Sequence, residues 1–407
     1  MKLSAYWTIS HWVDAYSNGA QPAELLSEWL QLQREDDPAW IEIITADQLA
    51  EELSKLDALK AKANTTEELP LYGIPIAVKD NIDALGFKTT AACPKYSYSP
   101  SEDAFSVKLL RDAGAIIVGK SNLDQFATGL VGTRSPYGEV PNSFDPKYIS
   151  GGSSSGSASL VARGLVPVAL GTDTAGSGRV PAGFNNIIGL KGTRGAISTQ
   201  GVVPACRTLD CVSVFALTLS DASLVFKILR KFNVNDPWCR SAPLGMTYNP
   251  IKKLGIPRNL PWFGDARHEQ AWHTFLSDLS ELDVELVKVD FTPFWSLASL
   301  LYEGPWVAER YVALNGFCDS HACDMNPVVR QIIEKSKQFS AASAFQAEYE
   351  RKQLQLEIGR LIEGLDGLLV PTTPFFPTIH DVSTDPITTN TRLGTYTNFV
   401  NLSDMCA

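Results

Sequence analysis

The sequence predicts an α/β fold in which helices cover both faces of a β-sheet. Stretches with apolar residues three and four positions apart alternate with short runs rich in Val, Ile and Leu. Strands that are apolar at successive positions are buried on both faces, which is typical of a sheet enclosed by helices. With 407 residues, 44% of them apolar, the chain is long enough to bury a large core.

Helical patterns dominate residues 20–65. The stretches at 23–33 and 45–63 place apolar residues on one helical face, so we predict a helix in each. The stretch before them, 1–16, is too polar for the apolar region of a signal peptide, and its tryptophans suggest a packed helix.

The glycine-rich middle of the chain predicts most of the sheet. LPLYGIPIAVKDNID (69–83) changes to a β-branched run that Gly73 and Pro75 mark as a strand. Further elements are predicted in this order: helix, strand, turn and helix within 106–129, a short helix at 157–164, a buried strand at 165–174, and a strand and turn at 185–195.

From residue 222 onward helical patterns return. They cover 266–282 and a long stretch at 326–365, and a buried strand followed by a proline-rich loop is predicted at 366–381. The chain ends in NFVNLSDMCA with neither a helix stop nor a polar tail. We therefore expect a truncated piece of a longer protein.

Composition excludes several classes of function. A net charge of −10 argues against general nucleic-acid binding and against a basic membrane-docking surface. No apolar run is long enough to span a membrane. Of the seven cysteines, only Cys206/Cys211 and Cys318/Cys323 are close in sequence, and neither pair has histidines at zinc-site spacing. We expect reduced thiols, no metal and no cofactor, and a cytoplasmic location.

Three polar features follow apolar strands. Lys79 ends the run IPIAV, and it either extends into water or has a lowered pKa that makes it a base near neutral pH. The tract SGGSSSGSASLVARG (150–164) has the composition of a linker, yet apolar strand signals flank it. GTDTAGSGRVP (171–181) is either a tight turn or a cradle of backbone N–H groups, and its spacing matches no phosphate-binding fingerprint.

Taken together, these features resemble the amidase signature family. The matching motifs are GIPIAVKDN, SGGSSSGSA and GTDTAGSGRVPAGFNNIIGLKGTRG, in that order. The resemblance implies that family's fold, a twisted mixed β-sheet with helices on both faces. It also implies one amidase domain over 1–407, with an N-terminal helical segment (1–65), a signature core (69–221) and a helical substrate-specificity part (222–407).

By the same resemblance the activity is amide hydrolysis by three residues. Ser177 corresponds to the nucleophile, Ser153 to a bridging serine with a cis peptide bond, and Lys79 to the terminal base. The assignment is chemically sound, because a serine needs a neighbouring base and a buried lysine can stay uncharged. No histidine is required, and none of the five lies near a serine motif in sequence.

Residues around the nucleophile have supporting roles in this prediction. Asp173 and Arg179 flank Ser177 and are interpreted as orienting its loop, and Ser154, Ser155 and Ser157 as making local hydrogen bonds or capping a helix. The expected oxyanion hole consists of four backbone N–H groups, those of Thr174, Ala175, Gly176 and Ser177.

The substrate prediction depends on LYEGPWVAERYVAL (301–314). This stretch resembles the substrate segment of allophanate hydrolases, the branch of the family that acts after urea carboxylation. The resemblance implies that Tyr302 and Arg310 bind the carboxylate of allophanate, while Pro305 starts a new helix between them. Without the family resemblance, Arg310 would be interpreted as a surface residue paired with a nearby acid.

Partners follow from the same resemblance. We expect functional coupling to a biotin-dependent urea carboxylase, separate or fused, and a homodimer formed through non-catalytic helices. Two alternatives stay open within the family: another amidase, or the A-type subunit of a transfer-RNA amidotransferase. A non-catalytic binding module is disfavoured because Lys79, Ser153 and Ser177 are all present.

Overall fold

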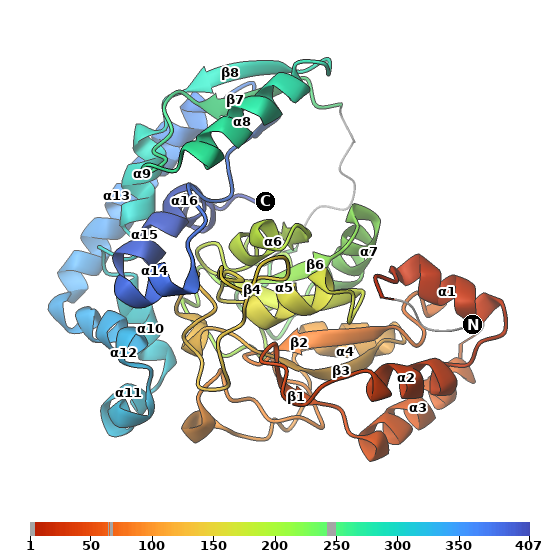
Figure 1. The fold of residues 1–407 in the computed structure, drawn as a ribbon. Helices are drawn as coiled ribbons and strands as arrows, with labels where there is room; N and C mark the ends of the chain where they lie inside the picture. Colours follow the sequence, from red (N-terminus) through yellow and green to blue (C-terminus); the bar gives the residue numbers. More distant parts are fainter. Residues whose placement is uncertain (1–4, 64, 66–67, 242–249) are drawn as a thin grey trace.

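A six-stranded sheet forms the centre of the molecule (Figure 1). The computed structural model describes residues 5–63, 65, 68–241 and 250–407, so the parts of the predicted helical segments at 1–4, 64, 66–67 and 242–249 lie outside it. The strand order is β1-β3-β2-β4-β6-β5. The strands are β1 (Trp40–Ile43), β2 (Pro75–Lys79), β3 (Ile116–Ser121), β4 (Val168–Asp173), β5 (Ile188–Lys191) and β6 (Cys211–Ala216).

The sheet is mixed, as predicted. Strands β3, β2 and β4 are parallel neighbours, whereas β1 and β6 run antiparallel to the strands they flank. Every residue of β2, β3 and β4 is buried. Burial on both faces explains why these strands have continuous apolar runs instead of alternation.

Helices cover both faces of this sheet, which confirms the predicted α/β class. The chain passes from β2 through α4 (Phe105–Asp112) to β3, and then back across the sheet through α5 (Ser155–Ala162) to β4. Because parallel crossovers are right-handed, these opposite crossings place α4 and α5 on opposite faces. Helix α7 (Leu219–Leu229) packs beside α4, and α6 (Val180–Phe184) packs beside α5.

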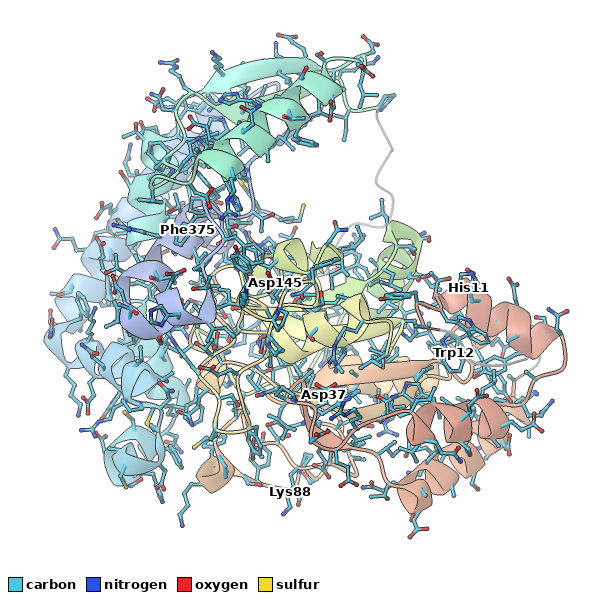
Figure 2. The ribbon with its side chains drawn as sticks, in the orientation of Figure 1. His11, Trp12, Asp37, Lys88, Asp145 and Phe375 are labelled. Atoms are coloured by element: carbon cyan, nitrogen blue, oxygen red, sulfur yellow. The ribbon has the colours of Figure 1, made fainter. Side chains whose placement is uncertain are left out.

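The N-terminal segment packs beside this core (Figure 1). It contains α1 (Ile9–Ser17), α2 (Pro22–Gln31) and α3 (Ala46–Lys60), as the apolar spacing predicts. On α1, Trp12 is buried and His11 is exposed (Figure 2). The expectation that 20–65 is helical throughout is wrong at β1, because this four-residue edge strand has its conformation set by pairing with β3.

A second, three-stranded parallel sheet, which the sequence patterns did not predict, lies at the top of Figure 1. It consists of β8 (Glu285–Val289), β7 (Lys253–Pro257) and β9 (Gly367–Leu368), beside α8 (Ala266–Leu279). The strand predicted at 366–381 is limited to β9. Further helices are α9 (Thr292–Ser299), α10 (Val307–Ala313), α11 (Phe317–Ser320), α12 (Pro327–Glu334), α13 (Ala341–Leu361), α14 (Ile379–Thr384), α15 (Thr388–Leu393) and α16 (Asn398–Leu402).

Two predicted helices differ from the structure. The stretch 326–365 divides into α12 and α13, because the Ser340 side chain accepts the Ser343 N–H and begins a new helix. The helix predicted at the end of 106–129 is a single 3₁₀ turn, Gln125–Ala127, with positive φ at Phe126. The segment closes a loop instead, in which the Asp124 carboxylate accepts backbone N–H groups of Val131, Gly132 and Arg134.

The site is positioned by the neighbouring strands β2 and β4. Val78 pairs with Leu170 in parallel register, so Lys79 at the end of β2 lies next to the last residues of β4. The tract 150–154 precedes α5 and approaches the same edge of the sheet. Ligands of open α/β sheets bind at this carboxyl edge, where the loops converge.

Candidate active site

Lys79 is fully buried at the end of β2. Its Nζ lies 2.8 Å from Ser153 Oγ and 2.7 Å from Thr172 Oγ1. Burial lowers the pKa of Lys79 to about 7, although the charges of Asp124, Asp210 and Asp173 oppose the shift. A large fraction of the amine is therefore uncharged near neutral pH, as a base requires.

The tract 150–164 is a packed part of the core and not a linker. Residues 150–161 are all buried, and the peptide bond between Gly152 and Ser153 is cis. A Cβ atom on Gly152 would collide with Asp124 Oδ2 and would lie 2.7 Å from the Gly132 nitrogen. Only glycine fits this approach, which holds Ser153 next to Lys79.

Two hydroxyls of the tract bind it to β4. Ser154 Oγ donates to Thr172 O at 3.1 Å, and Ser157 Oγ donates to Leu170 O at 2.9 Å. Ser154 is the N-cap residue of α5 but makes no side-chain capping bond. Ser154 and Ser157 therefore make the local hydrogen bonds expected of them and not capping bonds, whereas the expectation is wrong for Ser155, whose Oγ is buried without a partner among the described residues.

Ser177 lies on the turn 174–178 that follows β4, and it is buried. Its Oγ donates a long hydrogen bond, 3.4 Å, to the carbonyl of Gly129. Among the contacts of the described residues, Ser177 Oγ makes no hydrogen bond to Ser153 Oγ. The structure thus joins Lys79 to Ser153, and the link from Ser153 to Ser177 stays a prediction.

Asp173 and Arg179 hold the two ends of that turn. The Asp173 carboxylate accepts N–H groups of Gly176 and Gly178, each at 3.0 Å, and binds the guanidinium of Arg179 at 2.9 Å through both oxygens. Burial alone would raise the pKa of Asp173, but Arg179 holds it below the ordinary value. Arg179 also donates to Thr397 O at 3.0 Å, which links the turn to the C-terminal segment.

One of the four expected oxyanion donors is unavailable. The N–H of Gly176 is occupied by Asp173, because a carboxylate accepts backbone N–H groups strongly. In the described part of the chain, no acceptor is found for the N–H groups of Thr174, Ala175 and Ser177. The prediction is therefore wrong for Gly176, whose N–H is not available as an oxyanion donor. The amides of Thr174, Ala175 and Ser177 remain free to bind an oxyanion.

Removal of Arg179 is expected to destabilise the protein. Arg179→Met leaves Asp173 as a buried, unpaired carboxylate, a change that costs about 3–5 kcal/mol of unfolding free energy. The control is Arg163→Met, since Arg163 forms a partly exposed pair with Asp37 (labelled in Figure 2) and should lose about 1 kcal/mol or less. Urea denaturation of both variants checks this, and equal losses would contradict it.

Arg310 is buried and has no acidic partner among the described residues. Its Nη1 donates to Thr128 Oγ1 at 2.9 Å, and its Nη2 lies 3.4 Å from Tyr302 Oη. The guanidinium carbon lies 5.5 Å from the centre of the Tyr302 ring. The interpretation of Arg310 as a surface residue paired with an acid is therefore wrong. Asp210 and Glu309 are near enough for their charges to favour the cation but make no ion pair with it, so the guanidinium is available to bind an anion.

Arg310 and Ser177 converge on one loop. Thr128 accepts from Arg310, and the next residue, Gly129, accepts from Ser177. Asp124 closes this loop and also donates its backbone N–H to Ser153 O at 3.1 Å. The structure therefore brings the predicted anion-binding arginine and all three predicted catalytic residues to adjacent backbone segments.

Four further residues of the site were not predicted from the sequence. Thr172 accepts from Lys79 and, at 3.3 Å, from Asn81. Strand alternation could have identified Asn81, because residues i and i+2 share a face. Asp124 and Asp210 had no such signal, since only the folded chain brings them to the site.

The cysteines form no disulfide in the described part of the chain. All seven are free thiols, five of them buried. In the described ranges, no three His, Cys, Asp or Glu side chains are grouped so as to hold a metal ion. Over the same ranges, no helix has the length and apolar character needed to cross a membrane.

The arrangement matches the serine hydrolases that use lysine, and not histidine, as the base. A buried lysine bonded to one serine, with a second serine on a turn of free backbone amides, suits acyl transfer. The chain belongs to the amidase family, whose model matches residues 31–407.

Similar proteins agree with this family. Urea amidolyase of Saccharomyces cerevisiae is 49% identical over all of this chain, which covers 22% of that protein. The structure of Kluyveromyces lactis allophanate hydrolase is 48% identical with a TM-score of 0.93, covering 98% of this chain and 66% of that one. A glutamyl-tRNA(Gln) amidotransferase of Symbiobacterium thermophilum has an A-type subunit that is 34% identical over 82% of this chain and 74% of that protein. The chain thus spans about a fifth of the urea amidolyases it matches.

Proposed function

We propose that this chain hydrolyses the terminal amide of allophanate and releases ammonia. The observation that carries the proposal is the buried guanidinium of Arg310, which makes no ion pair with a described acid and contacts the same loop, at Thr128, that Ser177 contacts at Gly129. Allophanate has a carboxylate at one end and an amide at the other, so it satisfies both groups at once. The likeness to allophanate hydrolase of Kluyveromyces lactis supports this substrate.

In the proposed reaction Lys79 is the base. Its uncharged amine accepts the proton of Ser153 while Ser153 accepts the proton of Ser177, and Ser177 Oγ attacks the amide carbon. The carbonyl oxygen becomes negative and accepts hydrogen bonds from the free amides of Thr174, Ala175 and Ser177.

The tetrahedral intermediate then collapses. The C–N bond breaks, the proton returns through Ser153 to the leaving nitrogen, and ammonia departs from an acyl group on Ser177. Water, deprotonated by the same relay, attacks the acyl carbon and frees Ser177. Arg310 and Tyr302 hold the carboxylate throughout, so binding energy from the far end of the substrate positions the amide.

The coupling to other proteins is part of the proposal. The relatives named urea amidolyase are far longer than this chain, which suits a domain that works beside others. We propose that allophanate comes from a biotin-dependent urea carboxylase, fused or separate, in the cytoplasm. Homodimer formation through the non-catalytic helices stays a prediction for sedimentation analysis.

Ammonia release tests the function. The purified chain is given allophanate and, separately, the uncharged amide indoleacetamide and glutamine, a net-neutral amide that carries its own carboxylate. Turnover of allophanate with kcat/KM at least about tenfold above both amides supports the proposal. Preference for a neutral amide would instead support another amidase or an A-type amidotransferase subunit.

Truncation of Arg310 is expected to remove the preference for an anion. Arg310→Ala should lower kcat/KM for allophanate about 10²–10³-fold, because the substrate carboxylate is then buried without its partner. Activity on neutral amides should change little. Arg360→Ala is the control, since Arg360 is exposed on α13 and the substitution should be nearly neutral. An unchanged KM and kcat for allophanate in Arg310→Ala would remove the carboxylate assignment.

A further inference from the structure

The segment Ala205–Asp210, here called the connector, lies between the turn 174–178 and helix α10. Its last residue, Asp210, is buried and makes no ion pair with any described cation, although the charge of Arg310 acts on its carboxyl. The Asp210 carboxylate accepts the hydroxyl of Thr174 at 2.5 Å and backbone N–H groups of Ala205 at 2.8 Å and Cys206 at 3.2 Å. One end of the connector is therefore bound to the residue that begins the oxyanion turn.

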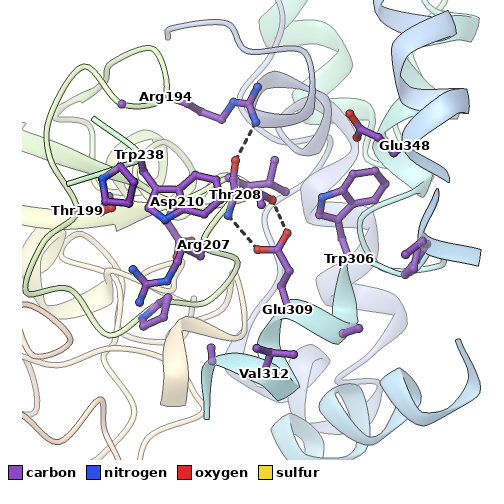
Figure 3. A pocket seen from close by; sticks show the side chains of 18 of the residues that line it. Arg194, Thr199, Arg207, Thr208, Asp210, Trp238, Trp306, Glu309, Val312 and Glu348 are labelled. Atoms are coloured by element: carbon purple, nitrogen blue, oxygen red, sulfur yellow. Dashed lines mark hydrogen bonds between the residues drawn. The ribbon is translucent and has the colours of Figure 1, made fainter. Parts of the chain in front are cut away.

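The middle of the connector is bound to α10. Thr208 donates its backbone N–H to Glu309 Oε2 at 2.9 Å, and its hydroxyl donates to Glu309 Oε1 (Figure 3). Arg194 supports Thr208 from the other side, donating to its carbonyl at 2.8 Å. The Cys206 thiol also lies 3.5 Å from the carbonyl of Trp306, the N-cap residue of α10.

Glu309 directly precedes Arg310 in α10. Consecutive residues of a helix have a set rotation and rise, so a contact that holds Glu309 also sets the position of Arg310. Apolar packing strengthens the connection, because Ala175, Cys206 and Leu209 belong to one buried cluster that also contains Leu300 and Leu301. Helix α10, the connector and the turn are thus joined by a continuous set of contacts.

We propose that the connector couples carboxylate binding at Arg310 to the amides of the oxyanion turn. In this role Thr208 and Glu309 are positioning residues for Arg310, and Asp210 is a positioning residue for Thr174. The inference rests on the proposed function, since it gives the bound carboxylate a route to the reacting amide. Anionic substrates then gain in turnover as well as in affinity.

Burial of Asp210 is consistent with this role. Removal from water raises the pKa of its carboxyl to about 6, a cost that the three accepted hydrogen bonds reduce. A neutral amide side chain would have to turn a donor toward at least one of these N–H groups. The carboxyl is the group that accepts from Thr174 and from both connector amides at once.

Two threonine variants separate the two contacts. Thr208→Val removes the hydroxyl bond to Glu309, and we expect KM for allophanate to rise about tenfold and kcat for allophanate to fall about threefold or more. Thr174→Val removes the hydroxyl bond to Asp210, and we expect kcat to fall about tenfold or more for allophanate and neutral amides alike. Thr199→Val is the matched control. Thr199 Oγ1 is buried without a partner among the described residues, and Thr199 lines the cavity that Thr208 and Asp210 also line (Figure 3).

Substrate charge distinguishes coupling from general damage. Thr208→Val should leave KM for the uncharged amide indoleacetamide unchanged, whereas distortion of the fold would raise this KM too and would overturn the inference. Thr208→Ser restores the hydroxyl and should restore the wild-type KM. If it does not, the Thr208–Glu309 bond is not the positioning contact.

The double variant tests the coupling itself. With allophanate, the Thr208→Val and Thr174→Val losses in kcat/KM should combine non-additively by about threefold or more, whereas additive losses would overturn the inference. Turnover of allophanate by the wild-type chain is measured first and tests the proposed function alone. Wild-type turnover with an unchanged KM in Thr208→Val would refute the connector and leave the function standing.

Discussion

Ser177→Ala is expected to lower kcat for ammonia release by about 10⁴-fold or more, because the variant lacks the nucleophile. The turn around Ser177 should persist, since Asp173 holds it through backbone amides and Arg179 and not through the Ser177 hydroxyl. The activity that remains would come from the free oxyanion amides and substrate binding alone.

A second buried serine provides the control for this experiment. Ser155 Oγ is buried without a hydrogen-bond partner among the described residues, so Ser155→Ala removes an oxygen that nothing uses. Its kcat should stay within about twofold of wild type. Circular dichroism confirms that both variants are folded. Full activity in folded Ser177→Ala would reject Ser177 as the nucleophile.

Lys79→Met is expected to abolish turnover and, at the same time, to stabilise the fold. The loss of kcat should again reach about 10⁴-fold, because neither serine then has a base. In the wild type, kcat/KM should fall as the pH drops below about 7, where the free enzyme's Lys79 takes up a proton. A pH profile of ammonia release, flat through pH 6–8, would show that another group sets the activity.

The stability effect follows from proton linkage. The folded pKa of Lys79, about 7, lies below the ordinary value of 10.5, so between these pH values the unfolded chain binds a proton that the folded chain does not. Unfolding free energy therefore rises with pH through this window, and the cost of burial is fully present below pH 7. Lys79→Met removes a cost on the order of 4 kcal/mol at low pH, offset in part by loss of its two hydrogen bonds.

Lys120 is the matched control for this stability gain. It is also fully buried, but its Nζ pairs with Asp80 at 3.4 Å and donates to Ile82 O at 2.8 Å. Lys120→Met leaves Asp80 without its cation and should lower the unfolding free energy by about 3–5 kcal/mol. Urea denaturation at pH 6 and pH 9 measures both variants. A Lys79→Met protein less stable than wild type at pH 6 would contradict the argument.

Local patterns were sufficient for much of the fold. Helices α1 to α3 have amphipathic spacing, and β2, β3 and β4 begin with continuous apolar runs, so both patterns are visible without the structure. The sequence-based predictions fail where strand pairing or helix capping determines the secondary structure. Strand β1 depends on β3, the second sheet joins strands more than a hundred residues apart, and Ser340 divides a continuous helical pattern.

For the candidate site, too, some residues could be identified from local sequence motifs and others only from the folded chain. Sequence motifs identified Lys79, Ser153 and Ser177. The tract that contains Ser153 is rich in glycine because only glycine allows the close backbone approach observed at Gly152. The sequence could not show that the Gly176 amide is occupied or that Arg310 is buried, since both depend on groups from other segments. Nor could it show that the Asp210 carboxyl binds Thr174, a contact across 36 residues.

The sequence alone therefore determined the family, the order of the chemical motifs along the chain and the residue types of the site. Those properties are local: a lysine after an apolar run, serines among glycines, an arginine after a proline. The tertiary structure alone decided which amides are free, that Arg310 is buried without an ion pair to a described acid, and how α10 is joined to the turn. Hydrogen bonding and burial decide these features, and both depend on neighbours that only the fold supplies.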